Sequence, residues 1–361
     1  MIRNILLYCR AGFENECSKE FAAVAQEFGT GEVKLAVPGS GYVLYSFLNE
    51  KSAHDCIKDL PFPALTFSRQ MIAASDEIGP LSAGDRVAPL VEAAKREGIA
   101  FSEFFVETAD TNEAKELSPL CKKLMGPFSG AFSDAGLLTV GEREEQSDGL
   151  LRRRLHIFFS ATDRARIGYS YVNNSSPWHQ GIPRLKFPAA APSRSTLKLE
   201  EAFLVFLTDE ERRKRLRQGL TAVDLGASPG GWTWQFVSRG VRVTAVDNGT
   251  MDGKLIASGL VQHVRGDGFT FAPKRPVDWM VSDIVDQPSR IARLAAQWMA
   301  RKWCRYCIFN LKLPMKKRYE EVCRCRDIIA SELGRSETKY SLQIKQLYHD
   351  REEVTAILVK L

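Results

Sequence analysis

The chain has 361 residues, 44% of them hydrophobic and 26% charged, which is the composition of a soluble globular protein with two or three domains. No uninterrupted apolar run reaches about 18 residues, so we expect neither a transmembrane helix nor a membrane partner. The formal net charge of +6 is uneven, with −5 on residues 1–170 and +11 on residues 171–361. A basic half favours a polyanionic partner such as RNA or DNA, although basic halves also occur without one.

The eight cysteines are scattered along the chain, which favours reduced thiols and a cytoplasmic location. The N-terminal residues lack the long apolar region and the cleavage site of a signal peptide, so we interpret them as a first strand. Two close pairs, Cys304 with Cys307 and Cys323 with Cys325, suggest zinc by their spacing, but one lies in a predicted helix and the other at a helix-to-strand junction. We therefore predict buried thiols and no metal site.

Residues 1–75 alternate between strand and helix patterns. Strands are expected at Ile2–Tyr8, Val33–Ala36, Gly41–Leu48 and Thr66–Ala74, with helices at Glu14–Phe28 and Ser52–Leu60. The order βαββαβ predicts a ferredoxin-like subdomain, which makes the N-terminal half an α+β region.

Residues 76–170 continue this half of the chain. Two amphipathic helices are predicted at residues 85–98 and 112–125, and strands at Glu103–Thr108, Leu151–Ser160 and Ala165–Val172. Residues 171–195 are then rich in Pro, Ser, Asn and Gly, so we interpret them as a linker, or as an extended arm that borders the active site.

Residues 196–361 alternate regularly between strand and helix. Helices are predicted at Thr196–Leu207, Asp209–Arg217, Trp232–Ser238, Ser289–Lys302 and Lys316–Leu333, and strands at Ala222–Asp224, Arg242–Asp247, Gln262–Arg265, Val277–Asp283, Tyr306–Leu313, Tyr340–Tyr348 and Val354–Lys360. This alternation predicts an α/β domain with a parallel, doubly wound, Rossmann-like sheet that binds its ligand at the carboxyl ends of the strands. No helix separates the last two strands, so we expect them to form an antiparallel hairpin at the sheet edge.

The most informative motif is DLGASPGGWT at residues 224–233, a strand end followed by a glycine-rich turn and a helix start. No Lys-Ser/Thr pair follows the glycines, which excludes a phosphate-binding P-loop. The spacing also differs from G-x-G-x-x-G, which argues against a dinucleotide. What remains is a loop whose backbone can approach a compact ligand, beside a carboxylate that can meet a positive charge.

Four aspartates lie at or just beyond predicted strand ends: Asp224, Asp247, Asp267 and Asp283. An isolated Asp in such a place is usually a helix cap or a turn former, but the ends of parallel strands share one crevice. Lys312 is unusual because it lies within an apolar strand, where lysine is depleted, unless its side chain reaches solvent at an edge.

These residues together resemble a known family. The motif at 224–233 is similar to the cofactor loop of the FtsJ-like S-adenosylmethionine-dependent 2′-O-methyltransferases, which also carry a Lys-Asp-Lys-Glu tetrad. This chain has Lys198, Asp283, Lys312 and Glu353 in the same order. Over its full length it resembles the bacterial 23S rRNA ribose methyltransferases of that family, whose N-terminal half contains a THUMP region. The resemblance implies a THUMP-like RNA-binding region at 76–170 and a methyltransferase domain at 196–361.

The resemblance also implies roles for individual residues. Lys312 would be the general base, oriented by Asp283, and Glu353 would hold Lys198 or position the ribose. S-adenosylmethionine would contact a set of loop and strand-end residues: Ser195, Asp224, Gly226, Ser228, Pro229, Gly230, Gly231, Trp232, Asp247, Asp267 and Asp283. Ser195 is equally suited to cap the helix that it begins. The target would be a cytidine of 23S rRNA, methylated before the large subunit is complete, and we expect a monomer.

A lysine base at neutral pH needs a lowered pKa. A second ammonium and partial burial lower the pKa of lysine, whereas neighbouring carboxylates raise it, so the sequence leaves the direction open for Lys312. Candidate RNA contacts are the cations and aromatic residues around the linker and before the glycine-rich turn: Arg152, Arg153, Arg154, Trp178, His179, Arg184, Lys186, Phe187, Arg194, Arg212, Arg213, Lys214, Arg215 and Arg217. The run at 212–217 is equally well explained as a solvated helix surface.

Two other functions stay open. One is methyl transfer to a protein or a small molecule, which the linker and the arginine cluster argue against. The other is a non-catalytic RNA-binding or ribosome assembly factor on a methyltransferase scaffold, which the presence of all four tetrad residues argues against.

Overall fold

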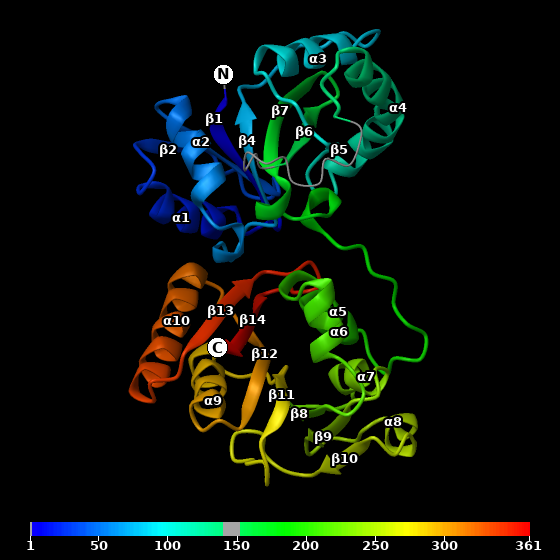
Figure 1. Cartoon of the computed structure of the whole chain (residues 1–361), viewed down its shortest axis with the longest axis vertical. Coiled ribbons are helices and arrows are strands. Elements are labelled where there is room, and N and C mark those ends of the chain that lie inside the picture. The colour runs from blue at the N-terminus through cyan, green and yellow to red at the C-terminus, as the bar shows by residue number, and fades with distance from the viewer. Residues whose placement is uncertain (1, 140–151) are drawn as a thin grey trace. The chain divides into compact units, whose positions relative to one another are not determined.

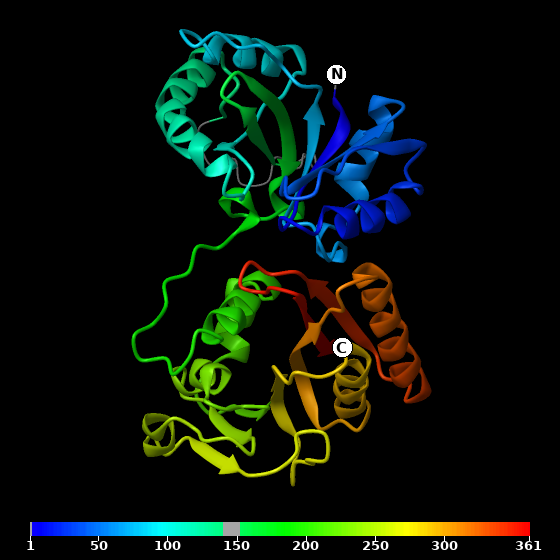
Figure 2. The ribbon, with the colours of Figure 1, turned by 180° about the vertical axis from the view of Figure 1, so that it is seen from behind.

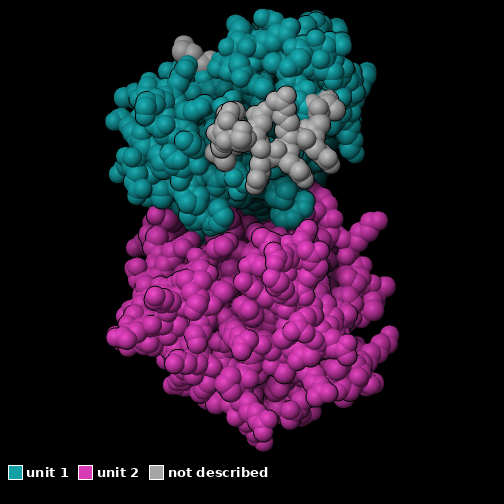
Figure 3. All heavy atoms as spheres, in the orientation of Figure 1, with its two compact units in different colours: residues 1–182 teal, residues 183–361 magenta. Residues whose placement is uncertain are grey.

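A computed structural model describes residues 2–139 and 152–361 of the chain. It divides into two compact units, residues 1–182 and residues 183–361, which Figure 3 draws in different colours. Leu151, the first residue of the predicted strand Leu151–Ser160, lies outside the described residues. The observed strand begins at Arg153.

The first part of unit 1 has the predicted ferredoxin-like order. Its strands are β1 (Ile2–Tyr8), β2 (Gly31–Leu35), β3 (Tyr42–Phe47) and β4 (Gln70–Ser75), and its helices are α1 (Glu14–Ala25) and α2 (Glu50–Asp59). The strands lie in the order β2-β3-β1-β4 and are antiparallel to their neighbours. Asn49 begins α2 by accepting a hydrogen bond from the backbone N–H of Ser52.

The remaining strands of unit 1 extend the same sheet. They are β5 (Glu103–Glu107), β6 (Arg153–Ala161) and β7 (Arg164–Tyr171), and β7 joins β4 to give the order β2-β3-β1-β4-β7-β6-β5 (Figure 1). At the junction Gly168 lies opposite Ala74, where a Cβ would collide with the backbone of Ala73. The two regions predicted as separate patterns therefore share one continuous sheet.

The described part of unit 1 also contains the helices α3 (Val87–Arg96) and α4 (Ser118–Asp134). The prediction of a helix at 112–125 was wrong in its bounds, because α4 runs through Pro127 for nine more residues. Its buried side chains are Cys121, Phe128 and Phe132, and the rings of Phe128 and Phe132 stack with centroids 5.5 Å apart. Burial of this apolar stripe outweighs the local cost of a proline within the helix.

The residues after β7 stay attached to unit 1. Within residues 2–139 and 152–361 the 3-10 helices are Phe62–Ala64 and Ala114–Leu117, which precede β7, and Val172–Asn174 and His179–Gly181, which follow it. The last is held by Glu107, whose buried carboxylate accepts hydrogen bonds from the backbone N–H of Gln180 (2.6 Å) and from Tyr8 (3.0 Å). Burial favours the neutral acid, but hydrogen bonds from His156 and His179 outweigh it and lower the pKa of Glu107 to about 2.

Unit 2 contains a second seven-stranded sheet. Its strands are β8 (Thr221–Leu225), β9 (Arg242–Val246), β10 (Val261–Val264), β11 (Val277–Ser282), β12 (Cys304–Lys312), β13 (Tyr340–Lys345) and β14 (Glu353–Lys360). The order is β10-β9-β8-β11-β12-β14-β13, with parallel pairing from β10 to β12. The predicted hairpin is present, and its strand β14 lies between β12 and β13, antiparallel to both.

Helices cover both faces of this sheet, as the Rossmann-like prediction requires. They are α5 (Thr196–Phe206), α6 (Asp209–Arg215), α7 (Gly231–Val237), α8 (Gly253–Ala257), α9 (Pro288–Ala300) and α10 (Arg318–Arg335). Figures 1 and 2 show α5 and α7 on one side of the strands, with α9 and α10 on the other.

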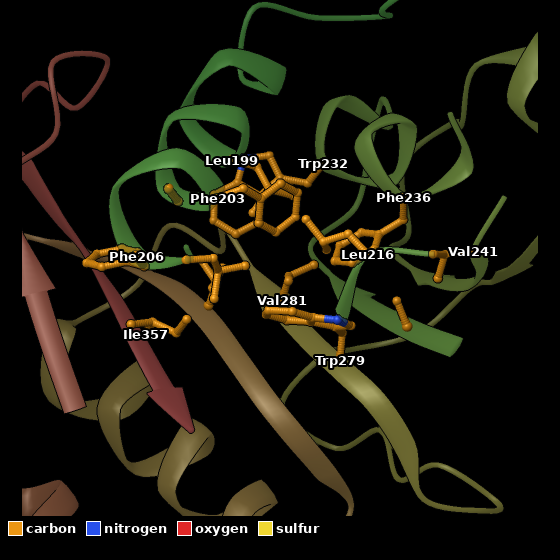
Figure 4. Close-up of a cluster of buried hydrophobic side chains, with 14 of the residues drawn as sticks. Leu199, Phe203, Phe206, Leu216, Trp232, Phe236, Val241, Trp279, Val281 and Ile357 are labelled. Carbon is orange, nitrogen blue, oxygen red and sulfur yellow. The ribbon is translucent and has the colours of Figure 1, made fainter. Parts of the chain in front are cut away.

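Under α5 and α7 lies the core cluster of Figure 4, in which Phe203 and Phe236 meet Trp279 of β11 with ring centroids 5.9 Å apart. Burial of such large aromatic side chains fixes the two helices against the sheet. Residues 183–195 connect the units without helix or strand. No helix among the described residues is long and apolar enough to cross a membrane.

Candidate active site

One face of the β12–β14 pair changes from apolar to charged along its length. Ile308 lies opposite Ile357, Asn310 opposite Thr355, and Lys312 opposite Glu353. The two isoleucines belong to the core cluster under α5 and α7. Because side chains two residues apart in a strand share a face, the next two pairs extend that face to the carboxyl end of β12. The strand therefore brings a lysine and a glutamate together where the apolar core ends.

The four tetrad residues meet at this point in an alternating ring of charges. Lys312 Nζ donates to Asp283 Oδ1 at 2.6 Å and also to Glu353 Oε2. Lys198 Nζ, from the first turn of α5, lies 3.5 Å from Asp283 Oδ2 and forms an ion pair with Glu353 Oε1. Each carboxylate thus uses one oxygen for each lysine. Every charge in the ring has an opposite charge on both sides.

The environment of Lys312 decides whether its pKa is raised or lowered. Burial lowers the pKa of Lys312, but the charges and hydrogen bonds of Asp283 and Glu353 outweigh burial and leave it above the usual range. The two carboxylates therefore hold Lys312 as an ammonium at neutral pH.

The glycine-rich loop approaches the same edge of the sheet from β8. Gly226 has a φ of 77°, and a Cβ there would lie 2.6 Å from a side-chain carbon of Ile284, the residue after Asp283. Gly230 has a φ of 117°, and its Cβ would collide with Leu255. Both positions require glycine. Each has a left-handed backbone conformation that other residues rarely adopt, and at each a neighbouring side chain occupies the space that a Cβ would need.

Gly231 packs against the segment that precedes α5. A Cβ at Gly231 would collide with the hydroxyls of Ser193 and Ser195, which lie 2.7 Å from each other. Trp232 donates its indole N–H to the backbone carbonyl of Ser195 at 3.1 Å. Ser195 makes no capping hydrogen bond, so the alternative of a helix cap was wrong for its side chain. Its hydroxyl instead belongs to the wall of the glycine-rich loop.

Asp224 is buried at the end of β8. Its Oδ2 accepts a hydrogen bond from the Thr233 hydroxyl at 2.7 Å, which ties β8 to α7. Burial raises the pKa of Asp224 to about 7, against the Thr233 hydrogen bond, and the nearby carboxylates of Asp283 and Asp247 raise it further. Among the described residues no cation forms an ion pair with Asp224. A positive charge placed beside Asp224 would lower this pKa again and favour the charged form.

Asp247 lies beside the loop at the end of β9. Its two carboxylate oxygens accept hydrogen bonds from the backbone N–H groups of Ser228 (3.0 Å) and Gly249 (2.6 Å). The Ser228 hydroxyl donates to the Thr250 carbonyl at 2.8 Å, and the carbonyl of Pro229 accepts from the Asp252 N–H at 3.0 Å. These bonds fix the loop and the carboxylate, whose oxygens each keep a second acceptor site for hydroxyl donors.

Asp267 has the commoner role of a turn former in this structure. Its carboxylate accepts the backbone N–H of Phe269 at 2.9 Å, and its carbonyl accepts from Thr270. The adjacent Gly268 lies against the same Ile284 that borders Gly226, because a Cβ there would lie 2.9 Å from its side chain. The loop of Asp267 therefore borders the same crevice as the glycine-rich loop.

Several buried polar residues near the tetrad were missed by the sequence reasoning. Asn310, Thr355 and Asp350 are fully buried behind it. Glu201 is also buried, three residues after Lys198 in α5. The available signal was Asn310 itself, a polar residue two places before Lys312 in an apolar strand.

The predicted RNA contacts differ widely in exposure. Arg154 is buried, bonded to Glu103 (3.0 Å) and the carbonyl of Ser176 (2.6 Å), so it is a structural residue. In α6, Arg212, Lys214 and Arg215 pair with the acidic residues of the helix's own first turn, which favours a solvated helix surface. The exposed members of the set are Arg152, His179, Arg184, Lys186, Phe187, Arg194, Arg213, Lys214 and Arg217.

Unit 2 is a doubly wound α/β domain. One edge of its sheet carries a glycine-rich loop, strand-end carboxylates and a ring of lysines and carboxylates. These features together indicate a methyltransferase. Family models match the chain as the RlmM ferredoxin-like domain (residues 2–72), the N-terminal domain of ribosomal RNA large subunit methyltransferase M (residues 85–171) and the FtsJ-like methyltransferase (residues 191–308). The chain belongs to the ribosomal RNA large subunit methyltransferase M family.

Curated relatives carry that name over their full length. The relative from Methylococcus capsulatus is 50% identical over 98% of this chain and 97% of its own length. Those from Mannheimia succiniciproducens and Marinomonas sp. are 47% and 46% identical, over 98% and 99% of this chain and 98% and 100% of their own lengths. The predicted family, enzyme class and fold are confirmed, and the predicted cofactor, S-adenosylmethionine, agrees with a methyltransferase. The FtsJ-like match ends at residue 308, before Lys312 and Glu353.

Proposed function

We propose that the protein methylates the 2′-hydroxyl of one ribose in 23S rRNA, with S-adenosylmethionine as the methyl donor and Lys312 as the general base. By family resemblance the target is a cytidine, modified before the large subunit is complete. The observation that carries the proposal is the ring of Lys198, Asp283, Lys312 and Glu353 beside the glycine-rich loop. The relatives' name, ribosomal RNA large subunit methyltransferase M, supports the choice of RNA.

The glycine-rich loop and its carboxylates form the proposed cofactor site. The cofactor supplies an electrophilic methyl group. Gly226, Gly230 and Gly231 leave the backbone bare where the ligand approaches, and the raised pKa of Asp224 makes it responsive to a nearby positive charge. Asp247, held by two backbone N–H groups, is in place to accept hydrogen bonds from ribose hydroxyls. The remaining predicted contacts, Ser195, Ser228, Pro229, Trp232, Asp267 and Asp283, line or support the same loops.

The tetrad supplies the proton chemistry. A ribose hydroxyl must lose its proton as it attacks a methyl group, and Lys312 Nζ is the proposed acceptor. Because two carboxylates hold Lys312 protonated in the free protein, the ammonium must first release a proton to solvent. After the transfer, Asp283 and Glu353 stabilise the ammonium that forms again. Lys198, which is paired with the same carboxylates, is proposed to orient the ribose oxygen.

RNA binding is assigned to both halves of the chain. In unit 2, Arg184, Lys186, Phe187 and Arg194 are exposed in the connecting segment, where cations meet phosphates and an aromatic ring can stack on an unpaired base. We propose that residues 1–75 and the THUMP-like region at 76–170 recognise RNA structure around the target. The protein is proposed to act as a cytoplasmic monomer.

The test of this proposal is the Lys312→Ala variant. It should lose methyl transfer to 23S rRNA while it binds S-adenosylmethionine with unchanged affinity by calorimetry. Lys360→Ala is the matched control, because Lys360 is an exposed strand lysine at the opposite end of β14 and should leave both properties unchanged. Retained methylation by Lys312→Ala would exclude Lys312 as the base. Methylated nucleotides that carry the mark on the base would exclude the ribose as the acceptor.

A further inference from the structure

Three fully buried polar side chains form a chain of hydrogen bonds behind the tetrad. Asn310 Nδ2 lies 2.9 Å from Asp283 Oδ1 and 3.5 Å from Glu353 Oε2. The Thr355 hydroxyl lies 2.8 Å from Asn310 Oδ1, 3.1 Å from Asp350 Oδ1 and 3.0 Å from Asp350 Oδ2. Nothing in the proposed reaction uses these three residues directly, yet all three are 0% exposed.

The orientation of the Asn310 amide follows from its neighbours. Both groups in front of it, Asp283 and Glu353, are acceptors, so the amide must turn its NH₂ group toward them. Its carbonyl oxygen then points at Thr355. The reverse orientation would place the carbonyl oxygen against two carboxylate oxygens and deprive both of an N–H donor.

The single hydrogen of the Thr355 hydroxyl is fixed by this orientation. A hydroxyl has one hydrogen to donate, and the carbonyl of Asn310 requires it. Thr355 has no hydrogen left for either oxygen of Asp350, so its contacts with Oδ1 and Oδ2 need a hydrogen on the Asp350 carboxyl group. Asp350 Oδ2 is already an acceptor for the backbone N–H of Leu347 at 2.9 Å. We therefore place the hydrogen on Oδ1, which contacts no other donor among the described residues, and leave Oδ2 as the acceptor.

The surroundings of Asp350 agree with a neutral carboxyl group. Burial raises the pKa of Asp350 well above its usual range, and the carboxylates of Glu353 and Glu201 act in the same direction. The Leu347 N–H and the Lys198 ammonium oppose this, but do not reverse it.

We propose that Asp350 carries a proton at neutral pH and starts a one-directional hydrogen-bond chain through Thr355 and Asn310 that positions the carboxylates of Asp283 and Glu353. Asp350, Thr355 and Asn310 are thus positioning residues, and this role rests on the proposed function of the tetrad. The chain delivers N–H groups to the same two oxygens, Asp283 Oδ1 and Glu353 Oε2, that accept from Lys312. It therefore fixes the positions of the two oxygens to which Lys312 donates.

The protonation of Asp350 is tested without any activity measurement. An acid that is neutral when folded but ionised when unfolded makes the protein less stable as pH rises, because the folded state binds the extra proton. Asp350→Asn removes this dependence and keeps one donor and one acceptor. Relative to wild type, its melting temperature should rise by roughly 3 °C for each pH unit between pH 5 and 7. A difference that stays constant or falls with pH would show an ionised Asp350 and overturn the proposal, whatever the protein methylates.

The positioning role is tested by the hydroxyl of Thr355. Thr355→Val keeps the shape but cannot donate to Asn310, so kcat should fall on the order of 10- to 100-fold with the KM for RNA and the cofactor affinity unchanged. Thr355→Ser should restore kcat to within about threefold of wild type. Thr244→Val, the same substitution in β9, is the matched control and should have no effect. Wild-type kcat in Thr355→Val, or no recovery in Thr355→Ser, would overturn the positioning role.

Discussion

Glu201 holds His349 by two hydrogen bonds, one from its backbone N–H at 2.9 Å and one from its imidazole Nδ1 at 2.6 Å. The same carboxylate accepts the backbone N–H of Tyr348 at 2.7 Å. Glu201 lies in α5 one turn after Lys198, and His349 lies in the turn that leads into Glu353. One buried carboxylate therefore joins the two elements that carry half of the tetrad.

Loss of this link should cost both stability and activity. Glu201→Ala removes a buried carboxylate that accepts from two partly buried backbone N–H groups, so we expect the free energy of unfolding to fall by about 3 kcal/mol. The kcat should fall as well, because Lys198 and Glu353 lose their common support. Denaturant unfolding and steady-state kinetics measure the two effects. Glu200→Ala, which removes a half-exposed ion pair with Arg239 on the same helix, should cost less than about 1 kcal/mol.

The raised pKa of Lys312 predicts how the reaction depends on pH. A general base is active only when neutral, and the neutral fraction grows about tenfold per pH unit below the pKa. The rate of a single turnover should therefore increase from pH 7 toward pH 9. Glu353→Gln removes one of the two charges that raise the pKa, so the rise should move to lower pH even if the maximum rate is smaller. A rate that declines over this range would contradict Lys312 as the base.

Cofactor affinity should depend on the ionisation of Asp224. Its pKa of about 7 means that the carboxyl group is mostly neutral at pH 6 and mostly charged at pH 8. A cationic ligand binds the charged form better, so the Kd for S-adenosylmethionine should increase as pH falls below 7, by up to about tenfold per unit. Calorimetric titration across this range measures the effect. In Asp224→Asn the affinity should be weaker and independent of pH, and a parallel slope in the variant would exclude Asp224.

Two exposed apolar side chains follow the strands that carry tetrad residues. Val285, two residues after Asp283, is 83% exposed, and Met315, three residues after Lys312, is 85% exposed. We expect them to contact the base of the target nucleotide, because apolar side chains pack on unstacked bases. The double variant Val285→Ser with Met315→Ser should raise the KM for RNA roughly tenfold at unchanged cofactor affinity. Leu361→Ser, at a residue that is 75% exposed just after β14, is the control and should leave the KM for RNA unchanged.

Features with a local cause were predictable from the sequence. The alternation of strand and helix patterns in residues 196–361 predicted the doubly wound sheet, because burial of one face imposes its period on the sequence. The glycine-rich turn at 224–233 could also be recognised, since Gly226 and Gly230 adopt backbone conformations that other residues avoid. The family resemblance then selected the four tetrad residues, and the structure brings them together.

Features that depend on pairing between distant strands were not predictable in the same way. The pairing of β4 with β7 depends on the close approach of the β4 backbone to Gly168. A single glycine of this kind leaves no periodic pattern in the sequence. The chain through Asn310, Thr355 and Asp350 depends on the register of β12 and β14. The direction of the Lys312 pKa depends on a competition between burial and two carboxylates at contact distance, which spacing alone does not decide.

Two tasks in unit 2 fall to the same strand. β14 pairs with β12 on one side and with β13 on the other, so it completes the sheet. It also carries Glu353, one of the two carboxylates that face Lys198 and Lys312. Without β14 the sheet would have a gap beside β12, and two ammonium groups would share a single carboxylate. The integrity of the sheet and the charge balance of the site therefore depend on one strand.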